Sequence, residues 1–137
     1  MGVSRGALVA VVDDDAAVRV AISSLLRSAG YRCATFDSAE VFLASGHLRS
    51  IHCVLLDVRM PGMSGLDLHL ALTRMLHPAP VIYVTATRDG GLRERALSQG
   101  AAAFFTNTFE DGELLDAIHL VLNSSGRDRA HDPGGPR

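Results

Sequence analysis

The sequence predicts an α/β fold in which five parallel strands form one sheet and helices cover both of its faces. Short apolar runs recur along the 137-residue chain, and between them lie segments whose apolar residues are three or four positions apart. The runs are typical of buried strands, and the spaced segments are typical of amphipathic helices. Because parallel strands are joined by right-handed crossovers, this alternation distributes the helices over both faces of the sheet.

Each predicted strand is a short stretch rich in apolar residues that ends at a polar residue or a turn. The clearest is 53–56, a continuous apolar run that stops at Asp57 and is followed by the chain breakers Pro61 and Gly62. A run of this kind indicates a strand that is buried on both faces. The five predicted strands cover residues 8–12, 31–36, 53–56, 81–84 and 102–106.

Five helices are predicted to follow these strands. Gly30 suits the left-handed position after the first helix, and Ser38 is a good N-cap for a short second helix that Gly46 ends. Gly90 and Gly91 each lower helix propensity by roughly 1 kcal/mol, so we expect the start of the fourth helix to fray. The apolar positions that mark the helices fall within residues 18–29, 41–43, 66–76, 92–99 and 114–122.

The composition is that of one globular domain. Hydrophobic residues make up 47% of the chain, charged residues make up 20%, and the formal net charge of −2 gives no electrostatic reason to expect nucleic acid or a membrane surface as a partner. No apolar stretch approaches the ~20 residues of a spanning helix, and no signal peptide is visible, so we expect a cytoplasmic protein. The predicted organisation is a short tail over 1–6, the domain over 7–122, and a disordered tail over 123–137, which is rich in Gly, Pro, Ser and charge.

The residues capable of special chemistry are few. Cys33 and Cys53 provide no disulfide framework, and we expect both to be reduced and packed. The six histidines show no metal-ligand spacing, and we expect them to be solvated or partly packed. All 13 basic residues are arginine, because the sequence contains no lysine.

Polar residues gather at the ends of three predicted strands. Asp13 and Asp14 follow the first strand, Asp57 follows the third, and Thr85 follows the fourth. Clustered carboxylates repel one another unless a cation gathers them, and Mg²⁺ suits oxygen ligands of this kind. A carboxylate beside such a metal can act as a nucleophile in phosphoryl transfer, with the Thr85 hydroxyl and the backbone N–H of Ala86 donating to the phosphoryl oxygens. Taken singly, Thr85 can equally be a plain strand residue, and Asp15 can be only the N-cap of a helix.

The chain contains four motifs, which are VVDDDAAVR, LLDVRMPGMSG, YVTAT and GAAAFFTNTF, in this order. Together, over about residues 7–122, they resemble the response-regulator receiver domain of two-component signalling. This resemblance implies a flavodoxin-like fold, doubly wound, with strand order 2-1-3-4-5. It also implies that Asp57 accepts a phosphoryl group from a sensor histidine kinase or a phosphotransfer protein, so that the chain signals rather than acting as an enzyme.

The resemblance also implies a metal site at the phosphoacceptor. Asp14 matches the residue that binds Mg²⁺ directly, and Asp13 matches the residue that holds a water of the metal. Asp57 and the backbone carbonyl of Arg59 complete the implied protein ligands.

The resemblance further implies a switch. Thr85 matches the switch hydroxyl, and Phe104 matches the aromatic switch residue, in an inward or an outward rotamer. The implied readout surface is the fourth helix, fifth strand and fifth helix, roughly residues 88–122, which would contact a downstream protein. Arg93 and Arg95 on that surface are either solvated or paired with acids across a homodimer.

The sequence departs from the family pattern after the fifth strand. Where the family has Lys-Pro, with the lysine paired to the phosphoryl group, this chain has Asn107 and Thr108. Asparagine can donate a hydrogen bond but brings no positive charge, and among the arginines Arg88 and Arg59 are the nearest candidates to replace it. We expect Asp57 to remain a phosphoacceptor and the coupling to the readout surface to be weakened or altered.

Two other functions remain open at this point. A pseudo-receiver would signal by protein contact without phosphorylation and need not bind Mg²⁺. A phosphatase of the haloacid-dehalogenase kind would use the first acid of a D-x-D motif, a spacing that Asp13 and Asp15 share. That motif's usual Thr or Val is replaced here by Ala17, and the lysine of such enzymes is absent. A flavodoxin is disfavoured because no Ser/Thr/Gly phosphate loop follows the first strand.

Overall fold

The computed structural model describes the chain over residues 6–86, 89–106 and 110–131, with side chains described as far as residue 124. Its five strands form one parallel sheet in the order β2-β1-β3-β4-β5, as predicted. The strands are β1 (Leu8–Val12), β2 (Arg32–Phe36), β3 (Cys53–Leu56), β4 (Val81–Thr85) and β5 (Ala103–Thr106). The helices are α1 (Ala16–Ser28), α2 (Ala39–Leu43), the 3-10 helix η1 (Leu48–Ser50), α3 (Gly65–Arg74), α4 (Gly90–Ser98) and α5 (Asp111–His131).

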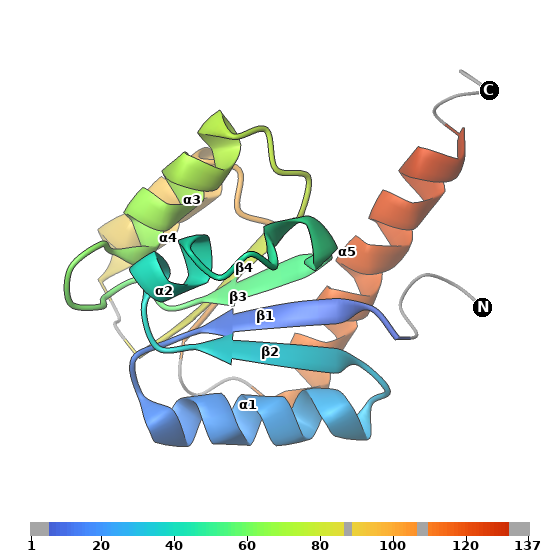
Figure 1. The fold of residues 1–137 in the computed structure, drawn as a ribbon, viewed down its shortest axis with the longest axis horizontal. Helices are drawn as coiled ribbons and strands as arrows, with labels where there is room; N and C mark the ends of the chain where they lie inside the picture. Colours follow the sequence, from blue (N-terminus) through green and yellow to red (C-terminus); the bar gives the residue numbers. More distant parts are fainter. Residues whose placement is uncertain (1–5, 87–88, 107–109, 132–137) are drawn as a thin grey trace.

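Helices cover both faces of the sheet (Figure 1). Helices α2, α3 and α4 pack on one face, where Leu56 of β3 lies in the core. Helices α1 and α5 pack on the other face, where Leu55 of β3 lies in a second core cluster. Since successive side chains of a strand point to opposite faces, a strand at the centre of such a sheet must be apolar at every position. This is why 53–56 is a continuous apolar run.

Local capping explains where the helices begin. The Asp15 carboxylate accepts hydrogen bonds from the N–H groups of Ala17 and Val18 at the start of α1. The Asp89 carboxylate accepts one from Gly91, at 2.9 Å, so α4 begins at Gly90 rather than near 92. A side-chain cap of this kind is worth about 1 kcal/mol, which offsets the low helix propensity of one glycine.

Helix α5 extends further toward its C-terminus than predicted. It begins at Asp111, where acids favour a helix start, and it continues to His131. The predicted disordered tail is therefore helical over residues 123–131, and Figure 1 shows this last part of α5 extending beyond the sheet. The apolar pattern stops at Leu122 because no core lies beyond it, but adding residues to an existing helix is much easier than starting one. Residues 132–137 lie outside the described residues.

The two cysteines are far apart in the sheet. Val9 of β1 pairs with Cys33 of β2 on one side and with Cys53 of β3 on the other, so two strand spacings, about 10 Å, separate them. Both are free thiols, as predicted.

None of the described helices combines the length and the apolar character that a membrane span requires.

Candidate functional site

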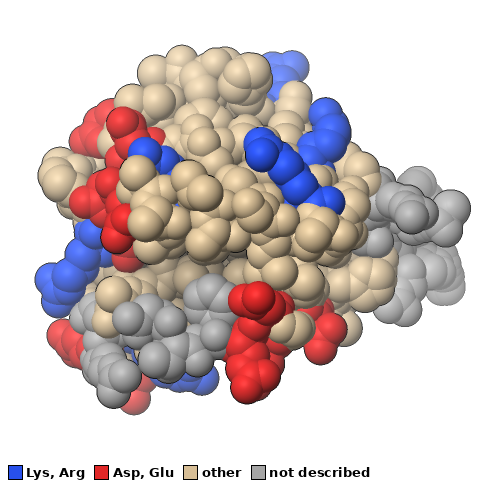
Figure 2. Space-filling view, turned by 90° about the horizontal axis from the view of Figure 1, so that it is seen from below, with Lys and Arg blue, Asp and Glu red and all other residues tan. Residues whose placement is uncertain are grey.

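Three carboxylates meet at the carboxyl ends of β1 and β3. These strands are neighbours in register, with Val12 opposite Leu56, so the residues that follow them leave the sheet side by side. The Asp57 N–H donates to the Val12 carbonyl at 3.1 Å and extends the ladder by one step. Asp13, Asp14 and Asp57 each place a carboxylate oxygen within 4.8 Å of the others. Figure 2, viewed with this edge of the sheet at the left, shows acidic side chains gathered there.

Asp13 is the most buried of the three, with 6% of its surface exposed. Its Oδ1 accepts a hydrogen bond from the Asp15 N–H at 2.9 Å, and its backbone carbonyl accepts one from Arg19 Nη1 at 2.7 Å. Burial raises the pKa of Asp13 to about 6; the Asp15 N–H opposes this shift, and the charges of Asp57, Asp14 and Asp15 add to it. The cluster therefore holds its negative charge at a cost in free energy.

Asp57 is bound to the residue that ends the neighbouring strand. Thr85, buried at the end of β4, donates its hydroxyl to Asp57 Oδ1 at 2.8 Å. Burial raises the pKa of Asp57, while hydrogen bonds from Thr85 and from the N–H groups of Arg59 and Val58 oppose that shift. The nearby charge of Asp14 raises this pKa further. The side chains predicted to act on one phosphoryl group are thus in direct contact.

The pocket at this edge can hold a hydrated cation. It has a volume of about 470 Å³ and is lined by the acidic cluster, by Thr85 and Ala86, and by apolar residues of α1 and β4. The oxygen donors Asp13, Asp14 and Asp57 are hard ligands of the kind that Mg²⁺ prefers. A divalent cation would counter the repulsion that adds to the rise that burial causes in the pKa values of Asp13 and Asp57. Asp15 lines the pocket, but its carboxylate caps α1, which removes the second acid of the D-x-D interpretation.

The start of α3 packs directly on the backbone of Asp57. A Cβ at position 65 would overlap the Asp57 carbonyl group, so only glycine fits there. The Gly65 N–H also donates to the Val58 carbonyl at 2.8 Å. This pair of contacts closes the loop between β3 and α3, and it was not part of the predicted site.

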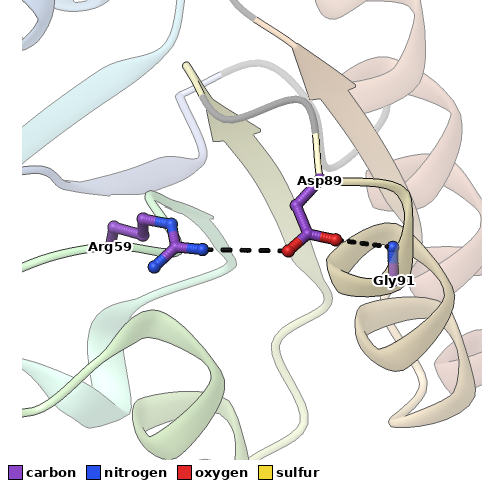
Figure 3. Close-up of polar contacts among 3 residues, drawn as sticks. All are labelled: Arg59, Asp89 and Gly91. Atoms are coloured by element: carbon purple, nitrogen blue, oxygen red, sulfur yellow. Dashed lines mark hydrogen bonds and ion pairs between the residues drawn. The ribbon is translucent and has the colours of Figure 1, made fainter.

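The Arg59 side chain is paired with an acid that is not a member of the cluster. Its guanidinium forms an ion pair with Asp89 at 3.9 Å, and both side chains are more than half exposed (Figure 3). In this structure the positive charge of Arg59 is therefore paired with Asp89. Its backbone carbonyl as a metal ligand, and the Ala86 N–H as a phosphoryl donor, stay predictions. The other predicted residues, Arg88, Asn107 and Thr108, lie outside the described residues.

Phe104 is half-buried and stacks on a polar pair in the core. Its ring lies 5.8 Å from that of Tyr83, with 31° between the ring planes. The Tyr83 hydroxyl is hydrogen bonded to His69 Nδ1 at 2.9 Å, and both side chains are buried. Burial lowers the pKa of His69. Arg93, which is exposed, donates from its Nη1 to the Phe104 carbonyl at 3.3 Å.

Sequence reasoning missed His69 as a core residue. It lies three residues after Leu66 and three before Leu72, on the buried face of α3, so its helical spacing was a signal for burial. Sequence reasoning also missed Glu40, whose carboxylate accepts a hydrogen bond from the Met63 N–H at 2.8 Å. No pattern in the sequence reveals that contact, because its partner is a backbone group.

The family model of the response regulator receiver domain matches residues 9–119. Among curated relatives, the response regulator protein TodT of Pseudomonas putida is 39% identical over 129 residues, which are 94% of this chain and 57% of TodT. Nodulation protein W of Bradyrhizobium diazoefficiens is 40% identical over 126 residues, which are 92% of this chain and 54% of that protein. The chain thus spans a little over half the length of these relatives.

Solved structures give the same result. The response regulator StyR matches with a TM-score of 0.82 and 41% identity, over 93% of this chain and 64% of that one. The BeF3-activated receiver domain of DrrB matches with a TM-score of 0.78 and 29% identity, over 85% of this chain and 97% of that one. Sequence, fold and the arrangement of strand-end aspartates agree, and the chain belongs to the response regulator receiver domains of two-component systems, a family of signalling domains.

Proposed function

We propose that Asp57 accepts a phosphoryl group from a sensor histidine kinase or a phosphotransfer protein, with Mg²⁺ held by Asp13, Asp14 and Asp57. The observation that carries this proposal is the hydrogen bond between Thr85 and Asp57, 2.8 Å long, in the same pocket as two further carboxylates. The residues proposed as nucleophile, metal ligands and hydroxyl donor therefore lie together at one edge of the sheet.

The chemistry follows from this arrangement. A carboxylate oxygen of Asp57 forms a bond to phosphorus while the bond between phosphorus and the donor's histidine nitrogen breaks, and the imidazole leaves with that electron pair. When bound, Mg²⁺ would neutralise charge on the phosphoryl oxygens. The Thr85 hydroxyl, which donates to Asp57 in this structure, would then donate to a phosphoryl oxygen. The Arg59 carbonyl and the Ala86 N–H are the proposed backbone contributions.

We further propose that the signal leaves through α4, β5 and α5, where a downstream protein or a second copy of the chain would bind. Support comes from two contacts of Phe104. Its ring packs against Tyr83 of β4, the strand that ends at Thr85, and its backbone carbonyl accepts a hydrogen bond from Arg93 of α4. Because Asn107 stands where the family has lysine, we expect phosphorylation to shift this surface less strongly than in relatives that have the lysine.

The test is phosphorylation of the purified chain by a small-molecule phosphodonor with Mg²⁺, followed by intact-mass measurement. We expect the mass of one phosphoryl group to be added to the wild type and to Asp15→Asn, which keeps an N-cap, and to be absent from Asp57→Asn. An adduct that persists in Asp57→Asn would disprove the site. A wild type that neither gains mass nor binds Mg²⁺ would support the alternative, a pseudo-receiver that acts by protein contact alone and that the missing lysine favours.

A further inference from the structure

The loop between Asp57 and Gly65 carries the proposed phosphoacceptor and the proposed carbonyl ligand of Arg59. Its two ends are fixed by the hydrogen bond from the Gly65 N–H to the Val58 carbonyl. Met60 holds its first half, because that side chain is buried against the α2–α4 face of the sheet. The ion pair of Arg59 is long, exposed and therefore weak. The tip of the loop, at Gly62 and Met63, needs a separate anchor.

Glu40 in the first turn of α2 provides that anchor. Its Oε2 accepts a hydrogen bond from the Met63 N–H at 2.8 Å, across 23 positions of the sequence. A carboxylate that accepts from a backbone N–H makes a stronger hydrogen bond than a neutral acceptor does. Glu40 itself is held by the short helix α2, which Ser38 caps and which Phe42 ties into the core. The contact therefore links the tip of the loop to a fixed element.

The shape of the loop fits this carboxylate. Gly62 has a positive φ of 78°, and a Cβ built on it would lie 2.6 Å from Glu40 Oε2. A side chain at position 62 would therefore both strain the backbone and displace the carboxylate. The contact with Glu40 is thus built into the conformation of the loop, rather than being a chance meeting of an exposed acid with a nearby N–H.

We infer that Glu40 is a positioning residue for the acidic site: by holding the Met63 N–H, it keeps the loop that carries Asp57 and Arg59 in the geometry required for Mg²⁺. This inference rests on the proposed function. The effect reaches the metal through the backbone and not through a direct contact, since Glu40 is not a member of the carboxylate cluster. Residues that orient metal ligands in this way affect metal affinity.

The test is isothermal titration of the folded chain with Mg²⁺. We expect Glu40→Ala to weaken Mg²⁺ binding about threefold to tenfold, the range that corresponds to the loss of one hydrogen bond. Glu40→Gln keeps an acceptor oxygen, and we expect it to restore part of the affinity. The matched control is Asp37→Ala, which removes the same charge from an exposed residue three positions earlier. Asp37 forms no hydrogen bond or ion pair with the loop among the residues that the structure describes, so this variant should bind Mg²⁺ like the wild type.

A second readout separates positioning from a general loss of structure. Amide exchange of Met63 should be faster in Glu40→Ala, while core amides of β1 and β3 keep their protection. Raising Mg²⁺ to saturation should restore the extent of Asp57 phosphorylation in this variant. Equal Mg²⁺ affinity in wild type and Glu40→Ala, or equal weakening in Asp37→Ala, would overturn the inference. A wild type that binds no Mg²⁺ would overturn the proposed function before any variant is compared.

Gly62→Ala provides an independent check of the same contact. It should weaken Mg²⁺ binding more than Glu40→Ala does, because it adds backbone strain to the clash with the carboxylate. In the double variant, Gly62→Ala with Glu40→Ala, the clash disappears and only the strain remains. Mg²⁺ binding should therefore be weakened by less than the product of the two single fold-changes. Independent, multiplicative effects would contradict the contact between the two residues.

Discussion

Burial has opposite effects in the body of the sheet and at the edge where its strands end. Val12 and Leu56 are fully buried among apolar side chains and stabilise the fold. One position further along each strand, Asp13 and Asp57 are carboxylates whose pKa values are raised by burial. Within one residue, burial changes from a source of stability to a cost, because desolvation favours apolar groups and disfavours charged ones.

It follows from this difference that the packed sheet fixes the positions of the acids at its edge. The strands bring the acids together through their register, with Val12 opposite Leu56. Truncating a buried apolar side chain of the sheet should therefore destabilise the protein. Replacing a buried acid at the edge by an uncharged side chain should stabilise it when no Mg²⁺ is present.

The largest effect is expected in the body. Leu55 is 1% exposed, and Leu55→Ala should lower the free energy of unfolding by about 3 kcal/mol, because it removes buried methyl groups and leaves a cavity. Urea denaturation monitored by circular dichroism measures this. Leu120→Ala is the matched control, since Leu120 is 67% exposed, and it should change stability by less than about 0.5 kcal/mol. Similar losses in both variants would mean that burial does not separate the two positions.

The next effect is expected at the edge and has the opposite sign. Without Mg²⁺ at pH 8, Asp13→Asn should raise the free energy of unfolding by about 2 kcal/mol, because the amide keeps the bond from the Asp15 N–H and removes the buried charge. Mg²⁺ should stabilise the wild type and have a smaller effect on this variant. Urea denaturation with and without Mg²⁺ measures both changes.

The pH dependence of this difference follows from the raised pKa. Asp13 has a pKa near 3.8 when unfolded and about 6 when folded, so the folded state binds more protons between these values. Stability from this group is complete below pH 3.8 and is lost as the pH rises through 6. The gap between Asp13→Asn and wild type should therefore open between pH 4 and 6 and stay constant above. A gap that is as large at pH 4 as at pH 8 would show that charge is not its cause.

The smallest effect is expected at the buried hydrogen bond between Tyr83 and His69. Tyr83→Phe should lower the free energy of unfolding by about 1 kcal/mol, because it removes the partner of buried His69 and keeps the ring on which Phe104 stacks. Thermal unfolding compares this variant with Tyr31→Phe, whose side chain is also buried, at 8% exposed, and whose hydroxyl has no hydrogen bond among the described residues. Equal losses in the two variants would show that the bond to His69 contributes nothing.

The sequence was sufficient for the parts of the molecule that depend on local pattern. Continuous apolar runs marked β1, β3 and β4, and the acids directly after them marked Asp13 and Asp57, because a strand that is buried on both faces must end where polarity begins. Parallel pairing then places those ends together. The strand order came from the family resemblance and agrees with the structure.

What the sequence could not reveal depends on contacts between distant residues. Glu40 and Met63 are 23 positions apart, and His69 and Tyr83 are 14 apart. Arg59 pairs with Asp89, although its position alone made it a candidate to replace the missing lysine. The continuation of α5 past Leu122 could not be predicted either, since backbone hydrogen bonds extend a helix without any apolar signal in the sequence.

The absence of a side chain at Gly65 has a consequence for how a change at the phosphoacceptor spreads. Helix α3 meets Asp57 through main chain on main chain, with no Cβ between them. Side-chain contacts can absorb a displacement by changing rotamer, whereas a contact between two backbones has no rotamer to change. A shift of the Asp57 peptide would therefore press directly on the first turn of α3.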